Sequence, residues 1–170
     1  MLFRSMDQGI HMLDLISYLL EERLRCEHAI ISTRHWDIEY EDNAMLSLIS
    51  SSGVMVSVHS SATQWDHKFA LEIYGATGSL KLQGLVTPSM SYAPEQLTFS
   101  LSPFEDRHAN WGHPSRNTMT FDIDDSWEKE LDEFVCAINK SIKIKHGTFE
   151  QALDVMRLID EAYSFRGSIG

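Results

Sequence analysis

The sequence predicts an α+β domain, with an open, predominantly antiparallel mixed sheet and helices packed on one face. The chain starts with a helical pattern, continues with a run of strand-like segments and closes with two more helical patterns. Runs of strands, without a helix between each pair, favour antiparallel pairing. A chain of 170 residues fits one domain, residues 1–170, and buries roughly 70% of its unfolded surface.

The first helix is predicted over residues 7–23 from its apolar spacing. Its apolar side is centred on Ile16 and is expected to face the core. That side also carries Met12, Leu13, Leu19 and Leu20.

The middle of the chain, residues 27–102, alternates apolar and polar side chains as strands do. Residues 44–50 and 54–62 read as a hairpin, because a turn signal ending in Gly53 separates them. Further strands are expected at 68–75, 79–82 and 96–101, and His59 is placed with Ser57 on the face opposite Val56 and Val58. We interpret His35 and Trp36 as strand surface, and Met45, Met55 and Met156 as core residues.

Residues 103–117 have no periodicity and predict a long loop, followed by a strand at 118–123. Ser126 is expected to cap a helix that runs to about Ser141. Thr148 is expected to cap the last helix, with Gly167 beyond its end.

Composition excludes several classes of protein. The net charge of −11 disfavours a nucleic-acid surface, and no apolar run approaches the length of a membrane span. The two cysteines, Cys26 and Cys136, lie far apart, which is typical of thiols in a reducing cytoplasm. No Gly-x-Gly-x-x-Gly turn follows a strand. We therefore expect a cytoplasmic protein with no nucleic-acid or membrane partner.

The first helix also carries a polar stripe. Asp7, His11, Asp14 and Tyr18 are spaced by four, three and four residues and so share one helical face. The stripe is either a solvated face, with Asp7 favoured by the helix dipole, or a functional one. In the functional interpretation Asp7 orients His11, and histidine side chains ordinarily titrate near pH 6.5, which suits a base that accepts a hydroxyl proton.

Several segments resemble the Gfo/Idh/MocA family of oxidoreductases. Residues 7–14, DQGIHMLD, are similar to the family's Asp-x-Gly-x-His-x-x-Asp signature. EIYGATGSLKL at 72–82 resembles its Gly-x-x-Gly-x-Leu strand pair, and SYAPEQLTF at 91–99 a segment of its sugar-nucleotide branch. The segments at 126–138 and 149–165 resemble its two last helices.

The resemblance implies the C-terminal, substrate-binding and oligomerisation domain of an NAD(P)-dependent dehydrogenase acting on a sugar, a sugar nucleotide or a polyol by hydride transfer. It implies that His11 is the catalytic base, that Asp7 is its partner acid and that Asp14 contacts substrate. It also implies a homo-oligomer formed through the open sheet face.

Nothing in the chain resembles the family's N-terminal Rossmann domain, its Gly-rich turn or its Glu-Lys-Pro motif. We expect NAD or NADP to serve a full-length parent, and this chain alone to bind neither and to be inactive. The alternative is a non-catalytic, stand-alone module for ligand binding, regulation or dimerisation.

The loop at 103–117 contains two further candidates for substrate contact, Arg107 and Trp111. An ordered surface loop is the alternative interpretation. Asp106, His108 and His113 lack the spacing of a metal site, so none is expected there.

Overall fold

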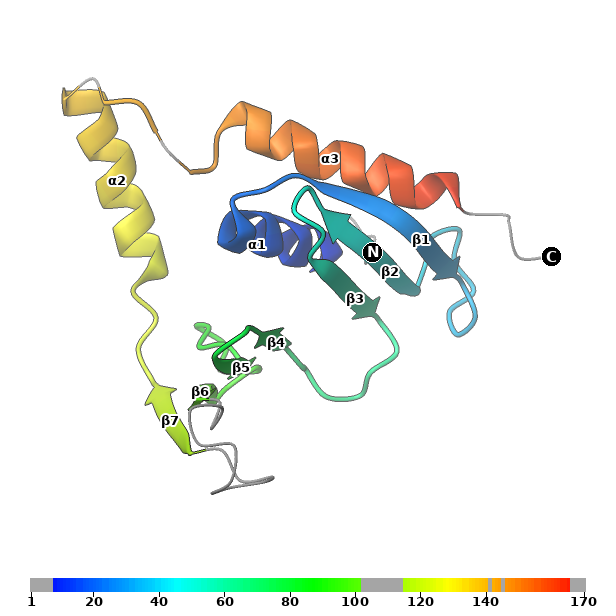
Figure 1. Ribbon diagram of the computed structural model, residues 1–170, viewed down its shortest axis with the longest axis horizontal. Helices are drawn as coiled ribbons and strands as arrows, with labels where there is room; N and C mark the ends of the chain where they lie inside the picture. The colour runs from blue at the N-terminus through cyan, green and yellow to red at the C-terminus, as the bar shows by residue number, and fades with distance from the viewer. Residues whose placement is uncertain (1–7, 102–114, 141, 145, 166–170) are drawn as a thin grey trace. The chain divides into compact units, whose positions relative to one another are not determined.

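The computed structural model describes residues 8–101, 115–140, 142–144 and 146–165, which contain three helices and seven strands (Figure 1). They divide into two compact units. The first unit is Met1–Thr63 with Cys136–Gly170, and the second unit is Gln64–Val135. All strand pairs in the described residues are antiparallel. The predicted α+β class with open antiparallel sheets and helices on one side is confirmed.

The first unit contains a three-stranded sheet in the order β1-β2-β3. Its strands are β1, Leu24–Ser32, β2, Asn43–Ser50, and β3, Met55–Ser61. The predicted hairpin joins β2 to β3, and Gly53 at its turn has φ 91°, a conformation that favours glycine. The sequence did not single out β1, whose register shifts between Cys26 and His28. This bulge breaks the two-residue alternation that reveals a strand.

Helices α1, Ile10–Leu20, and α3, Phe149–Ser164, pack on the same face of this sheet. Helix α3 contacts β1 and α1, and it runs alongside β1 in Figure 1. The core they enclose draws on both helices and all three strands. Its buried members are Leu13, Cys26, Ala29, Leu46, Leu48, Val58, Val155, Leu158, Ile159 and Ala162.

Helix α1 is shorter than predicted at its end. It stops at Leu20, because Glu21 has φ 52° and lies in the left-handed region, where a helix cannot continue. Leu13 is 1% exposed and anchors the helix to the core, as expected from the apolar stripe. Leu19, expected on the core side, is instead 46% exposed. It lies in the last turn of the helix, just before the helix ends at Leu20.

The other face of the three-stranded sheet is open. Met45 and Met55, which we expected in the core, are 50% and 87% exposed on this face, so that expectation is wrong. The reason is their register: Met45 lies between the buried Ala44 and Leu46, and Met55 precedes Val56, which packs against the core, so both methionines point away from α1 and α3. Met156 does pack against the core. His59 is exposed while Val58 is buried, which confirms their predicted separation.

His35 and Trp36 lie in a loop between β1 and β2, not on a strand as predicted. Asp42 holds this loop: its Oδ2 accepts hydrogen bonds from the backbone N–H groups of Arg34, His35 and Trp36 at 3.0, 2.7 and 3.1 Å. Burial raises the pKa of Asp42, but hydrogen bonds from the Asn43 amide and these three N–H groups outweigh it and lower the pKa to about 2.

The second unit contains a four-stranded sheet in the order β4-β5-β6-β7. Its strands are β4, Ala70–Tyr74, β5, Gly78–Gln83, β6, Glu95–Leu101, and β7, Arg116–Phe121. They confirm the four strands expected here, with ends shifted by a few residues. The register aligns Leu71, Leu82, Leu97 and Met119 on one face. The opposite face is polar and includes the Lys81–Glu72 ion pair at 3.0 Å.

Helix α2, Ser126–Lys140, confirms the predicted helix. Its apolar positions are exposed, including Trp127 at 73% and Leu131 at 62%. The predicted loop at 103–117 falls mostly outside the described residues, and so do Arg107 and Trp111. No helix among the described residues is long and apolar enough to cross a membrane.

Candidate functional site

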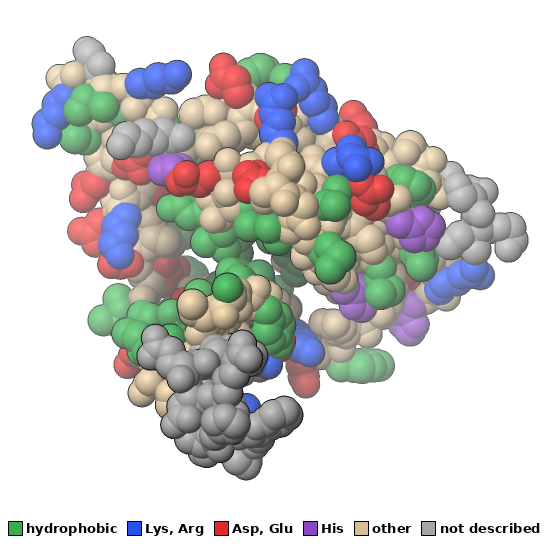
Figure 2. Space-filling model, viewed as in Figure 1, with side chains coloured by type: hydrophobic (Ala, Val, Ile, Leu, Met, Phe, Trp, Pro, Cys, Tyr) green, Lys and Arg blue, Asp and Glu red, His purple; other side chains and the backbone are tan. Residues whose placement is uncertain are grey.

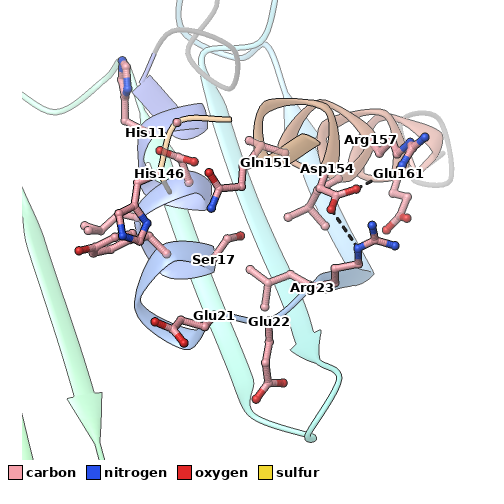
Figure 3. A pocket seen from close by; sticks show the side chains of 17 residues that line it. His11, Ser17, Glu21, Glu22, Arg23, His146, Gln151, Asp154, Arg157 and Glu161 are labelled. Carbon is pink, nitrogen blue, oxygen red and sulfur yellow. Dashed lines mark hydrogen bonds and ion pairs between the residues drawn. The ribbon is translucent and has the colours of Figure 1, made fainter. Parts of the chain in front are cut away.

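A groove of about 720 Å³ lies in the first unit between α1 and the start of α3 (Figure 3). This volume is in the range of small-molecule sites, roughly 300–1,000 Å³. Polar residues and a few apolar ones line it, and they come from α1, the turn that follows it, the start of β1, the turn before α3, and α3 itself. The lining residues are His11, Asp14, Leu15, Ser17, Tyr18, Glu21, Glu22, Arg23, Leu24, His146, Gly147, Gln151, Asp154, Val155, Arg157, Leu158 and Glu161.

The α1 wall of the groove carries three members of the predicted polar stripe. Leu13 is turned into the core, so His11, Asp14 and Tyr18 are left on the exposed side, where all three line the groove. Figure 3 shows the His11 imidazole at the end of this wall, pointing away from Gln151. Asp7, the predicted partner of His11, lies outside the described residues.

The opposite wall begins with a tight turn into α3. Gly147 has φ 68°, and Thr148 caps the helix: its Oγ1 accepts from the Gln151 N–H at 3.2 Å, while Gln151 Oε1 accepts from the Thr148 N–H at 2.9 Å. This turn places His146 against Tyr18, edge to face, with ring centroids 4.8 Å apart. The sequence predicted the cap at Thr148. It did not single out His146 or Gln151, although a cap at Thr148 puts residue 151 at the third helical position.

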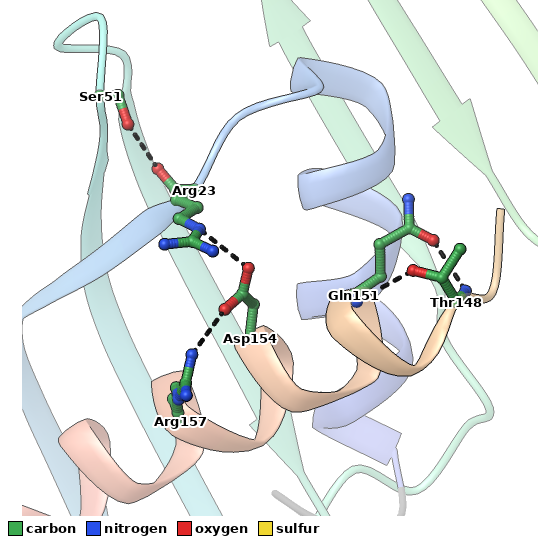
Figure 4. A network of polar contacts seen from close by, with 6 residues as sticks. All are labelled: Arg23, Ser51, Thr148, Gln151, Asp154 and Arg157. Atoms are coloured by element: carbon green, nitrogen blue, oxygen red, sulfur yellow. Dashed lines mark hydrogen bonds and ion pairs between the residues drawn. The ribbon is translucent and has the colours of Figure 1, made fainter. Parts of the chain in front are cut away.

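A charged cluster lies at the far end of the groove (Figure 4). Asp154 accepts from Arg23 Nε at 2.9 Å through Oδ2, and from Arg157 Nη1 at 3.2 Å through Oδ1. The Ser51 hydroxyl donates to the Arg23 carbonyl at 3.4 Å, which ties the β2–β3 turn to this end. Acidic and basic side chains are intermixed over α3 in Figure 2. Neither arginine was a sequence candidate.

Two glutamates of the groove also brace the sheet. The Ser52 backbone N–H donates to Glu22 Oε2 at 2.8 Å, and together with the hydroxyls of Ser50 and Ser52 it lowers the pKa of Glu22. Glu161 Oε2 accepts from the Cys26 N–H at 3.0 Å, at the β-bulge. Burial, reinforced by the negative charge of Glu161, raises the pKa of the Cys26 thiol. Cys26 and Cys136 are both free.

Metal and dinucleotide binding are not supported by the residues the structure describes. They include no group of three or more His, Cys, Asp or Glu side chains that could hold a metal ion. Their strands pair only antiparallel, whereas a dinucleotide fold needs parallel strands joined through a Gly-rich turn and a helix. The described residues contain no such parallel unit.

The groove can bind hydroxyl groups and accept a proton. Asp14 offers carboxylate oxygens, Gln151 an amide, and Tyr18 a hydroxyl. The exposed His11 imidazole, when neutral, has one nitrogen that can accept a proton from a bound alcohol.

We next compared the chain with known protein families. Residues 5–81 match a family model described as the GFO/IDH/MocA C-terminal domain, which confirms the resemblance found in the sequence. No curated protein matches the sequence significantly.

Solved structures share the fold at low identity. Aldose-aldose oxidoreductase from Caulobacter crescentus, complexed with glycerol, is 22% identical, with a TM-score of 0.71 over 95% of this chain and 44% of that one. The WlbA dehydrogenase from Bordetella pertussis, in complex with NADH and UDP-GlcNAcA, is 16% identical, with a TM-score of 0.62 over 95% and 42%. The chain thus spans less than half the length of these two structures.

Proposed function

We propose that this chain, whose residues 5–81 match the model of the GFO/IDH/MocA C-terminal domain, is the substrate-binding and oligomerisation domain of an NAD(P)-dependent oxidoreductase. The substrate class is a sugar, a sugar nucleotide or a polyol. Support for this class comes from relatives of the same fold, one complexed with glycerol and another with NADH and UDP-GlcNAcA.

The observation that carries this proposal is the position of His11. Leu13, two residues along α1, is buried in the core, and this fixes the rotation of the helix so that His11 and Asp14 line the groove. His11 acts as the general base for the hydroxyl that is oxidised, and Asp14 holds the substrate through its carboxylate. Asp7 orients His11, and Arg107 and Trp111 contact substrate; these three roles rest on the sequence alone.

The nicotinamide cofactor belongs to the full-length parent. We expect this chain alone to bind neither NADH nor NADPH and to be inactive, an expectation supported by its described strands, which pair only antiparallel. Titration of the chain with NADH, followed by nicotinamide fluorescence, tests this expectation. Binding with micromolar affinity would contradict it.

The catalytic role of His11 is tested in an enzyme that joins this domain to its nucleotide-binding domain. His11→Ala is expected to lower kcat by about two to four orders of magnitude, the usual contribution of a general base, with a smaller change in KM. Met12→Leu is the matched control, because Met12 is the next residue on α1 and does not line the groove. Near-normal turnover of His11→Ala would show that His11 is not the general base.

The open face of the three-stranded sheet is the proposed oligomer contact. It presents Ile30, Met45 and Met55, which are 42%, 50% and 87% exposed, together with the exposed His59. An apolar surface of this kind favours association with a partner surface. Sedimentation velocity measures it directly, and a monomer at all concentrations would contradict it.

A further inference from the structure

We propose that His146 and Gln151 form, with Tyr18 and Asp14, a subsite that binds the hydroxyl-bearing ring of the substrate. This inference rests on the proposed function and extends it from the α1 wall to the α3 wall of the same groove. Two of its residues, Tyr18 and His146, lie outside the segments that resemble the family. The ligand chemistry is a neutral polyhydroxylated ring.

Tyr18 and His146 supply an aromatic corner. The Tyr18 ring is 50% exposed although it lines a groove, and His146 contacts it edge to face at 4.8 Å. An aromatic ring combines an apolar face with a polar tip, which matches a sugar ring with C–H groups on its faces and hydroxyls at its rim. The left-handed Gly147 and the Thr148 cap hold His146 in place from the α3 side.

Gln151 supplies donors. Its carbonyl oxygen is engaged by the Thr148 N–H at 2.9 Å, which fixes the side chain and its orientation. The amide nitrogen keeps two N–H groups for a ligand, and Figure 3 shows this side chain projecting into the groove. Asp14 on α1 supplies the complementary acceptors. A hydroxyl both donates and accepts, so a polyol can satisfy both walls at once.

Charge favours a neutral ring here over a phosphate. Asp14, Glu21 and Glu22 line the α1 side of the groove, and Glu161 lines the α3 side. The two arginines of the groove are both paired with Asp154. A phosphate would meet uncompensated carboxylates, whereas a ring hydroxyl can donate to them.

The test is a backbone-amide NMR titration of the full chain with D-glucose, myo-inositol, UDP-glucose and UDP. We expect D-glucose, myo-inositol or UDP-glucose to shift the amides of Asp14, Tyr18, Gly147 and Gln151. Shifts of the same amides by UDP alone would show that the phosphates occupy the groove, and would overturn the proposal.

The decisive variant is Gln151→Glu. Glutamate preserves the capping box at this position, so the unfolding temperature should stay unchanged, but it removes both amide donors. We expect the Kd of the ring to rise about tenfold in this variant, as the loss of a hydrogen bond predicts. Gln83→Glu, the same chemical change on an exposed residue of β5, is the matched control and should bind like the wild type.

His146→Ala removes the aromatic corner without touching the cap, and should also weaken binding about tenfold, the upper range for one aromatic contact. Wild-type affinity in both Gln151→Glu and His146→Ala would overturn the subsite and leave the proposed function standing. No binding by any of the four compounds would overturn the subsite and the proposed substrate-binding role together.

Discussion

The two sheets of the molecule have the same alternating sequence pattern and opposite degrees of burial. In the first unit, ten side chains form a buried core under α1 and α3, with Leu13 at 1% and Ala29 at 2% exposure. In the second unit, no described residue between Gln64 and Val135 is buried, and Leu80 on the apolar face of its sheet is 42% exposed. Alternation therefore specifies a strand and its apolar face, whereas burial requires a second layer on that face.

The largest expected difference between the units is in the cost of truncating a leucine. Leu13→Ala should lower the free energy of unfolding by about 3 kcal/mol or more, because it leaves a cavity in the core. Leu80→Ala should cost less than about 1 kcal/mol, since its side chain is already half exposed. Urea denaturation of both variants measures the contrast. Equal losses would show that the apolar face of β4–β7 is as well covered as the core.

The second contrast is between two carboxylates. Asp42→Ala should cost about 2–3 kcal/mol, because it removes a buried carboxylate that accepts three hydrogen bonds from the backbone N–H groups of the loop. Glu72 in the second unit is exposed, so Glu72→Gln should leave the unfolding midpoint unchanged. A silent Asp42→Ala would show that the 33–42 loop does not contribute to stability.

Asp42 also predicts an acid dependence of stability. Its pKa is lowered to about 2 in the folded chain, from 3.8. The stabilisation is therefore fully present above about pH 4 and is lost as the pH falls through about 2. Chemical denaturation from pH 6 down to about pH 2 should show a shallower loss in Asp42→Asn than in the wild type. If the free energy of unfolding fell equally with pH in Asp42→Asn and the wild type, the role assigned to Asp42 would be contradicted.

A third contrast compares turn glycines. Gly84 has φ 73°, and a Cβ there would collide with the carbonyl oxygens of Pro94 and Tyr92. Gly53 has φ 91° and open space around it. Gly84→Ala should thus cost about 2 kcal/mol, and Gly53→Ala about 1 kcal/mol, the strain of the backbone conformation alone. Thermal unfolding compares the stability losses of the two variants. A larger loss for Gly53→Ala would show that the tighter turn lies in the first unit.

The smallest expected effect on stability is at the open sheet face. Met55→Lys should change the free energy of unfolding by less than about 0.5 kcal/mol, because Met55 is 87% exposed. It should nevertheless abolish association through that face, since a charge would be buried on contact. Sedimentation velocity of Met55→Lys against Ser57→Thr, a neutral change on the same exposed face of β3, separates the two effects. Unchanged association of Met55→Lys would move the proposed contact elsewhere.

Local patterns in the sequence were enough to predict most secondary structure. The cap at Thr148 is confirmed as a capping box, and the turn at Gly53 has the positive φ expected of a hairpin glycine. These features depend on a few adjacent residues, so they can be predicted before any packing is known. Strand β1 was not predicted, because the bulge after Cys26 gives its buried residues a spacing of three rather than two.

Half of the candidate site was predictable for the same reason. Helical spacing alone grouped His11, Asp14 and Tyr18, and the structure places all three along one groove. His146, Gln151 and Asp154 come from a segment far from α1 in the sequence, and Asp154 pairs with Arg23, which lies just beyond the end of α1. No local pattern connects such segments, so their meeting could not be predicted.

The sequence by itself therefore determined the order of the helices and of the strands other than β1, the polar stripe of the first helix and the family resemblance, because each is encoded in short-range spacing. Only the tertiary structure decided that α3 closes a groove against that stripe, and that Met45 and Met55 face outward while Leu13 is buried. The physical reason is that burial and groove formation depend on which layer covers which face. Contacts between segments far apart in the chain decide that choice.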